Sequence, residues 1–411
     1  MKDFLKLMLV SPLLWAMSCS SDDSNSKQVP DAEPIVLKSD FDSKMNTNNL
    51  FAINLFKTTV EKSDGNVLVS PLSVNMALNM TWNGADGTTK SEMQQMLGNE
   101  GYTPSEINEY SKSLSEALLK VDPTTELLIA NSIWTTKDLP LEKSFIEVNQ
   151  NNYNATVEEV DFSSPATLGK INTWCSEKTK GKIPKALDQL ASETKFALIN
   201  ALYFKGKWRS TFDAKNTVDA LFANADGKRP IVKMMIQESS FGYTDNENWR
   251  CLSLPYGNNA FSMVILLPNN GKKMNDLFPT LTADSWSTML DRLSNHKVVV
   301  RLPRFKGEYA YDMHKEILPA MGMKQAFNPD EANFSKMCSL APLYITQVVH
   351  KTFVEVNEEG TEAAAITVVV GEVTSVGPES TIDFFVDQPF IYAIRENSTG
   401  TILFIGKVDN F

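Results

Sequence analysis

The chain has 411 residues, of which 42% are hydrophobic and 22% are charged, a balance that is ordinary for a globular protein with a large core. Its net charge is −11 and it has no dense block of lysine or arginine, which argues against nucleic acid, heparin-like polyanions and anionic membrane surfaces as partners. No proline- or serine-rich linker and no internal repeat interrupts residues 41–411, so we expect one large monomeric domain over that range.

Residues 1–18 predict an export signal. Lys2 and Lys6 give a positive start, and residues 4–17 are mostly apolar. The apolar stretch is too short, and too interrupted by proline, to cross a membrane as a helix.

Cys19 and the polar residues after it resemble the start of a mature bacterial lipoprotein, in which the cysteine carries the lipid. Ala16 replaces the usual leucine three places earlier, so a signal peptide that is simply cleaved stays open as an alternative. The Ser-Asp-Asp run at 21–23 resembles surface-export signals of Bacteroidota lipoproteins, from which we expect a cell-envelope protein of the outer membrane, exposed at the surface. Residues 19–40 are polar and acidic, which predicts a flexible tether.

Helices are expected mainly in the first half of the chain and strands in the second. Ser70 followed by Pro71 is a typical helix start, and that helix should end near Trp82. Apolar spacing predicts further helices at 43–62, 105–120 and 166–180. Strand patterns occupy 127–135, 197–205, 229–236, 250–254, 260–267, 296–302, 343–356, 382–386, 390–395 and 401–406. This order predicts an α+β fold.

The remaining cysteines, Cys175, Cys251 and Cys338, are odd in number and widely spaced. They do not form a disulfide framework, and we expect buried free thiols.

Sequence motifs of enzymes are missing. The only histidines, His296, His314 and His350, are far apart and lack the His-Glu-x-x-His pattern of a zinc protease. Gly-x-Ser-x-Gly, a P-loop, a dinucleotide fingerprint and a calcium-loop ladder are also absent. We therefore expect no enzymatic activity, no metal and no cofactor.

Residues 358–370, Glu-Glu-Gly-Thr-Glu-Ala-Ala-Ala-Ile-Thr-Val-Val-Val, are the most informative stretch. Small and β-branched residues without proline make a strand possible, although Thr-Glu-Ala-Ala-Ala is also a good start for a surface helix. The next ten residues, 371–380, are loop-like, so no short turn leads to a partner strand. A strand-competent segment inside a loop makes sense if it becomes a strand later.

In a strand, this segment would have two unlike faces, because alternate residues share a face. The charges of Glu362 and Glu372 fall on one face. The other face consists of Thr361, Ala363, Ala365, Thr367 and Val369. These side chains are small enough to enter a tight sheet with little overpacking.

Several motifs in the same order resemble the serpin family. Residues 358–365 look like the hinge of the family's reactive-centre loop, and Asn-Val-Leu-Val-Ser-Pro-Leu-Ser at 66–73 looks like its second-helix motif. Asn-Ala-Leu-Tyr-Phe-Lys-Gly-Lys-Trp at 200–208 and the segment 387–408 resemble two further signatures. The resemblance covers roughly residues 41–411. It implies three β-sheets, about nine helices and an exposed loop at about 358–380.

The resemblance also implies roles for single residues. The hinge would comprise Glu358, Glu359, Gly360, Thr361, Glu362, Ala363, Ala364 and Ala365. Gly360 would be its pivot, or an ordinary turn glycine, and Thr361 would enter the sheet first.

Four polar residues match the region where the family's main sheet opens, namely Ser70, Ser73, Asn200 and His350. If buried, they must hydrogen-bond to one another or to backbone, either as one network or as four unrelated polar groups. Trp208 matches the tryptophan at the top of that sheet, a position that core packing alone also explains.

The implied function is irreversible inhibition of serine proteases, and also of papain-like cysteine proteases, with the acyl-enzyme trapped as the cleaved loop enters the main sheet. Fourteen inserted residues would span roughly 46 Å. One alternative is a non-inhibitory serpin that acts as a binding or chaperone-like surface lipoprotein. Another is a surface lipoprotein with an enzymatic role, which the missing motifs disfavour.

The expected cleavage site is the bond between Thr374 and Ser375, with neighbouring bonds around Glu372, Val373 and Val376 as alternatives. Small uncharged residues suit the shallow pocket of elastase-like or subtilisin-like proteases. Residues 360–380 contain no lysine or arginine, which disfavours a trypsin-like target.

Overall fold

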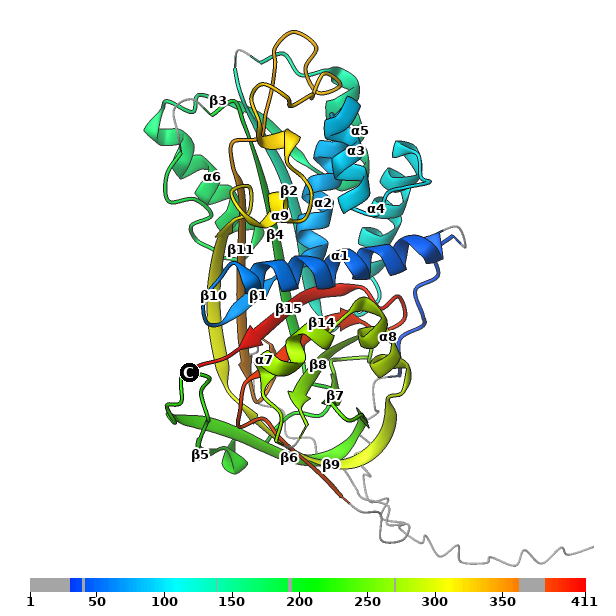
Figure 1. Ribbon diagram of the computed structural model, residues 1–411, viewed down its shortest axis with the longest axis vertical. Coiled ribbons are helices and arrows are strands. Elements are labelled where there is room, and N and C mark those ends of the chain that lie inside the picture. The colour runs from blue at the N-terminus through cyan, green and yellow to red at the C-terminus, as the bar shows by residue number, and fades with distance from the viewer. Residues whose placement is uncertain (1–29, 39–40, 138, 191–193, 270, 362–380) are drawn as a thin grey trace, which may run out of the picture.

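The structure is a computed structural model that describes residues 30–38, 41–137, 139–190, 194–269, 271–361 and 381–411. The fold is α+β, as predicted, with six helices before residue 179 and most strands after it. Figure 1 shows a six-stranded sheet along the long axis of the molecule, with α2 to α5 on one side of its upper half and α6 on the other. A nine-stranded sheet fills the lower half.

The four predicted helices are confirmed to within two residues, and the described ranges contain five more. The helices are α1 (Asp42–Glu61), α2 (Pro71–Trp82), α3 (Gly87–Met96), α4 (Pro104–Leu118), α5 (Lys143–Tyr153), α6 (Pro165–Lys178), α7 (Met274–Leu277), α8 (Ala283–Asp291) and α9 (Ile317–Ala320). At the start of α2 the hydroxyl of Ser70 accepts a hydrogen bond from the amide of Ser73, and Pro71 occupies the first helical turn.

The six-stranded sheet has the order β10-β11-β12-β4-β2-β3. Its strands are β10 (Phe305–Asp312), β11 (Val348–Asn357), β12 (Gly360–Thr361), β4 (Phe196–Lys207), β2 (Glu126–Thr136) and β3 (Thr156–Val160). One face of β4 joins the main core through Leu198, Leu202 and Phe204. The other face joins a second apolar cluster with Ile171 and Trp174 of α6.

The nine-stranded sheet has the order β1-β15-β14-β8-β7-β6-β9-β13, with β5 paired to β6. Its strands are β1 (Val67–Val69), β5 (Val218–Leu221), β6 (Ile231–Asp245), β7 (Trp249–Pro255), β8 (Phe261–Pro268), β9 (Ser294–Pro303), β13 (Ile382–Phe385), β14 (Phe390–Glu396) and β15 (Ile402–Val408).

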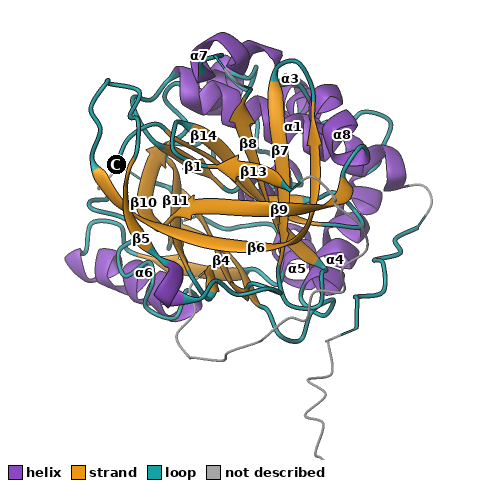
Figure 2. Ribbon diagram, turned by 90° about the horizontal axis from the view of Figure 1, so that it is seen from below, coloured by secondary structure: helices purple, strands orange, loops and turns teal. Residues whose placement is uncertain are grey.

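Three sheets were expected, but the strands described here connect into two. The reason is the 15-residue strand β6, which pairs with β9 from Met234 to Tyr243 and with β7 from Gly242 to Asp245. It joins what would otherwise be separate second and third sheets. Figure 2, seen from below, shows β6 and β9 side by side across the lower end of the molecule.

Residues 30–38, which belong to the predicted tether 19–40, lie along the domain. We call this segment the N-terminal strap. The amide of Ala32 donates to the carbonyl of Asn258 (2.8 Å) and the amide of Ile35 to the hydroxyl of Ser398 (2.9 Å). Ala32, Ile35 and Leu37 pack against the core, so the apolar side chains of this acidic stretch are partly removed from water.

Cys175, Cys251 and Cys338 are buried free thiols, as predicted. Among the helices of the described ranges, none combines the length and the apolar character that crossing a membrane requires.

Candidate functional site: the hinge and the seam beside it

The six-stranded sheet contains a seam between β4 and β11 that is closed at both ends, and in its middle these two strands do not pair with each other. The two strands run parallel and pair directly only at Leu198–Asn200 with Val348–His350. At the other end β12 lies between them, antiparallel to both. Within the described part of the chain, the five β4 residues 201–205 have no pairing with β11. The seam can therefore take up a further strand that continues from β12.

Gly360 shows why the hinge begins with glycine. It pairs with Lys207 of β4 and has φ of +150°. A Cβ atom here would lie 2.0 Å from the carbonyl oxygen of Gly206, which no side chain tolerates. Close approach of two backbones, rather than a turn, is what requires the glycine in this structure.

Thr361 is buried in the sheet, with 2% of its surface exposed. Its hydroxyl lies 2.7 Å from the phenol oxygen of Tyr256, and its backbone pairs with Gly206 and Val356. The hinge is thus already seated before any cleavage, with Thr361 facing the core as the alternation of its segment predicted.

Trp208 closes the sheet next to the hinge. Its ring stacks on that of Tyr256 at 4.5 Å and 13°. Its indole N–H donates to the carbonyl of Asn357 (2.9 Å), and its backbone amide donates to the carbonyl of Glu359 (2.8 Å). Trp208 therefore packs in the core and also holds the hinge backbone.

Glu358 anchors the hinge electrostatically. Arg304 donates to its carboxylate through Nε (2.8 Å), and the hydroxyl of Thr217 donates to the same oxygen (2.5 Å). Burial alone would raise the pKa of Glu358, but the hydrogen bonds from Arg304 and Thr217 outweigh burial and hold the pKa below its ordinary value. The carboxylate is therefore charged at neutral pH and fixes the point where the chain leaves β11.

The four polar residues predicted for sheet opening meet at the paired end of the seam. The backbone amide of Ser70 donates to Nε2 of His350 (2.9 Å), and the hydroxyl of Ser73 donates to the side-chain oxygen of Asn200. His350 and Asn200 are direct partners across the two strands. The start of α2 therefore binds both sides of the seam at once.

His350 acts here as a neutral acceptor. Burial lowers its pKa to about 3, because no charged partner compensates for the loss of water around an imidazolium. The Ser70 amide can donate a hydrogen bond only to an unprotonated Nε2.

Sequence reasoning missed Asn131, whose side-chain oxygen accepts from the amide of Asn200. An asparagine in the middle of the apolar run 127–134 was a usable signal, since a buried polar side chain needs a partner. Tyr256 and Arg304 were missed as well, and no local pattern marks them, because their role depends on long-range contact with the hinge.

Several predicted residues lie outside the described residues. These are Cys19, Glu362, Ala363, Ala364, Ala365, Thr374 and Ser375. Their roles stay predictions.

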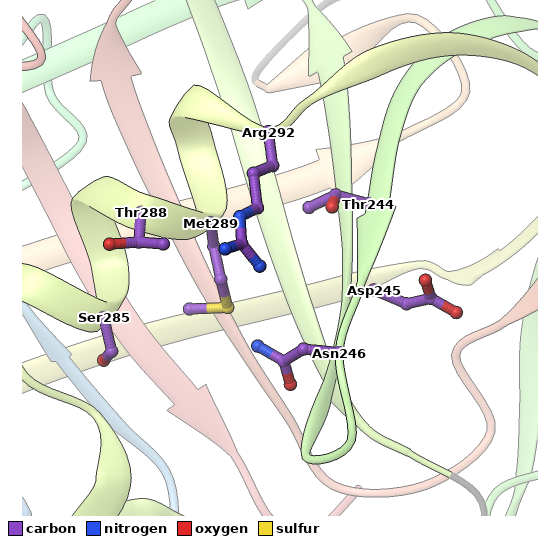
Figure 3. A pocket seen from close by; sticks show the side chains of 7 residues that line it. All are labelled: Thr244, Asp245, Asn246, Ser285, Thr288, Met289 and Arg292. Carbon is purple, nitrogen blue, oxygen red and sulfur yellow. The ribbon is translucent and has the colours of Figure 1, made fainter.

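Figure 3 shows a small surface pocket of about 140 Å³ between α8 and the turn that follows β6. The guanidinium of Arg292 points into it beside Met289, whereas the carboxylate of Asp245 points away. The pocket holds no acid–base pair, and its lining residues do not include those of the hinge or the seam.

Three comparisons place the chain among known proteins. The family model described as "Serpin (serine protease inhibitor)" matches residues 46–411. The leukocyte elastase inhibitor of Bos taurus is 38% identical over 376 residues, covering 88% of this chain and 98% of the relative. Serpin B8 of Homo sapiens is also 38% identical, covering 89% and 99%.

Solved structures agree with these sequence matches. The thermophilic serpin tengpin in its native state has a TM-score of 0.83 at 33% identity, covering 93% of this chain and 97% of that one. The same protein in its latent state has a TM-score of 0.77. The present structure is thus more similar to the native form, in keeping with a seam whose middle is unpaired among the described residues.

Proposed function

Since the chain belongs to the serpin family, we propose that it inhibits proteases irreversibly, as a substrate that is cut once and then not released. The single observation that carries this proposal is the seated hinge. Gly360 and Thr361 already pair with both β4 and β11, and the seam ahead of them is free of direct β4–β11 pairing until Asn200.

The chemistry belongs to the target protease. Its serine or cysteine attacks the carbonyl carbon of the residue before the cut, the peptide bond breaks, and the amine of the next residue leaves. The protease is then bound to the loop as an ester or thioester. Water must attack this acyl bond for the protease to escape.

Insertion competes with that escape. If the register of β12 continues, the ten β4 residues 196–205 each gain a partner from the loop. Ten residues at about 3.3 Å each carry the bound protease roughly 33 Å along the sheet. This is shorter than the 46 Å expected from fourteen residues, but it would press the protease against the far end of the domain. A misplacement of about 1 Å among the protease's catalytic groups already costs up to a hundredfold in rate.

We propose a target with a shallow primary pocket, elastase-like or subtilisin-like, and as a second class a papain-like cysteine protease. Two observations support this choice. The expected residue before the cut, Thr374, is small and uncharged. Relatives at 38% and 36% identity are named leukocyte elastase inhibitors. A binding or chaperone-like role without inhibition is the second candidate, and no contact in the described residues favours it.

The decisive experiment is incubation of the purified chain with proteases of these classes. We expect a covalent complex that survives SDS, and a released C-terminal fragment that mass spectrometry finds to begin at Ser375. A fragment that begins at Val373, Thr374 or Val376 would move the cleaved bond by one or two residues and leave the trapping mechanism unchanged. Slow turnover without a complex, for every protease that cuts the loop, would reassign the chain to the non-inhibitory class. A fragment that starts before Ile366 would leave too few residues to form the inserted strand.

We also propose that the chain is a monomeric, surface-exposed lipoprotein of the outer membrane, with its lipid on Cys19. The support is the sequence alone: the positive start, the short apolar stretch and the cysteine before a polar run. Mass spectrometry of the mature N-terminal peptide tests this. We expect Cys19 as the first residue, carrying acyl chains, and an unmodified peptide that begins elsewhere would contradict it.

A further inference from the structure

A buried chain of hydrogen bonds leads from the seam to α4. Asn131 of β2, which binds Asn200, donates through its own amide to the carbonyl of Tyr153 at the end of α5 (2.8 Å). The phenol of Tyr153 donates to the side-chain oxygen of Asn108 on α4 (2.8 Å). Burial raises the pKa of Tyr153, so the phenol keeps its proton as a donor.

The chain returns to α2 and closes into a ring. Asn108 and Asn83 exchange two hydrogen bonds through their side chains, at 2.9 and 3.0 Å. Asn83 caps the end of α2, and Ser73 lies in its first turn. The helix that binds both sides of the seam is therefore held at each end by the same set of polar groups.

When the loop inserts, the residues of this ring fall into two groups of helices and strands that must move relative to each other, and we call these groups the two bodies. A new strand requires β4 to move away from β11. β2 pairs with β4 over ten residues and with β3 over five, so these strands move together. Although α5 as a whole packs mainly on α4, its end at Tyr153 is held by these strands, because the Tyr153 carbonyl is bound to Asn131 and β3 begins at Thr156.

The other body contains β11, α2 and α4. Ser70 at the start of α2 is bound to His350 of β11, and β1 just before it pairs with β15. Asn83 ties α4 to α2. Two side-chain hydrogen bonds of the ring then cross between the bodies: Ser73 to Asn200, and Tyr153 to Asn108.

We propose that the Tyr153–Asn108 hydrogen bond is a second restraint on opening of the seam, which makes Tyr153 and Asn108 positioning residues for loop insertion. This inference rests on the proposed inhibitory function. The restraint acts only before insertion, because the bond must break as β4 moves.

The test is Tyr153→Phe, which removes the hydroxyl and keeps the ring. The matched control is Tyr110→Phe. Tyr110 is also buried, and its hydroxyl accepts from Asn48 (2.9 Å), but this bond joins α4 to α1. Helix α1 packs on α2, β1 and β15, so the control bond lies within one body.

Two quantities are measured for wild type and both variants: the rate at which the intact chain loses its capacity to form the protease complex on warming, and the melting temperatures of the intact and loop-nicked forms. We expect Tyr153→Phe to raise the rate about three- to tenfold, as the loss of one net hydrogen bond allows. Its nicked form should melt close to nicked wild type. Tyr110→Phe should lower both melting temperatures equally and leave the rate within twofold.

The restraint would be overturned if the two variants lost their capacity to form the complex at equal rates. It would also be overturned if nicked Tyr153→Phe were destabilised as much as the intact variant. Either result would leave the proposed function intact. A wild-type chain that forms no complex and gains no stability on nicking would overturn the proposed function, and the restraint with it.

Discussion

Cleavage of the wild-type chain between residues 370 and 377 is expected to raise its melting temperature by tens of degrees. Before cleavage the seam leaves the 201–205 stretch of β4 without a partner toward β11 among the described residues. Insertion adds two ladders of hydrogen bonds, roughly ten to twenty in number, each contributing about 0.5–1.5 kcal/mol net. This gain rivals the whole stability of a domain, about 5–15 kcal/mol.

The gain is partly offset, because the three pairs that close the seam at Leu198–Asn200 must break. The measurement is thermal unfolding of intact and nicked protein by circular dichroism or calorimetry, with the site of the nick verified by mass. A nicked chain that melts at or below the intact chain would show that the loop does not insert. A nick made by a protease that the chain does not inhibit serves as well, because insertion depends on cleavage and not on which enzyme made the cut.

The second large effect is expected for Thr361→Arg, which should convert the inhibitor into a substrate. Thr361 is 2% exposed and its hydroxyl meets that of Tyr256, so an arginine at this position should leave the sheet in the intact chain. Insertion of the cleaved loop would then have to carry its unpaired charge into the core. Burying such a charge costs several kcal/mol. Since each ~1.4 kcal/mol is tenfold in rate, insertion should slow by roughly a hundredfold or more, and hydrolysis of the acyl bond should win.

Glu362→Arg is the matched control, with the same new side chain one residue later. In the continued register it falls opposite Lys205 and Glu355, both partly exposed. Complex formation and substrate turnover are measured together on gels for wild type and both variants. We expect the Glu362 variant to inhibit as wild type does. Efficient inhibition by Thr361→Arg would show that this position does not face the core during insertion.

The sequence predicted the elements that local patterns specify. Ser70 and Pro71 identify the start of α2 because a cap and a fixed backbone angle are local properties, and the α+β order follows from periodicity. Helix α3 was missed, since Gly87–Met96 has only Thr89 and Met93 buried and shows little apolar spacing. The merging of two sheets through β6 was missed because pairing partners lie far apart in the sequence.

The residues of the candidate site divide in the same way, into those that a local motif identifies and those that only long-range contacts identify. Ser70, Ser73, Asn200 and His350 were identified through motif resemblance, and the structure brings all four together. Arg304 and Thr217 escaped notice because nothing near them in sequence indicates that they bind Glu358. That the hinge is already seated also escaped prediction, since it depends on the fit of Gly360 against the Gly206 carbonyl.

If the chain carries its lipid on Cys19, as proposed, the N-terminal strap also decides which end of the domain lies near the membrane. Asp31 lies 2.5 Å from Arg209, one residue beyond Trp208, so the chain departs from the domain near the hinge. With the lipid on Cys19, as proposed, only the eleven residues 20–30 separate that cysteine from Asp31, a reach of at most about 36–40 Å. The loop end of the domain is then kept close to the lipid, and the opposite end points outward. On that proposal, the captured protease would work within a few nanometres of the membrane that carries the inhibitor, and trapping would displace the protease away from this membrane.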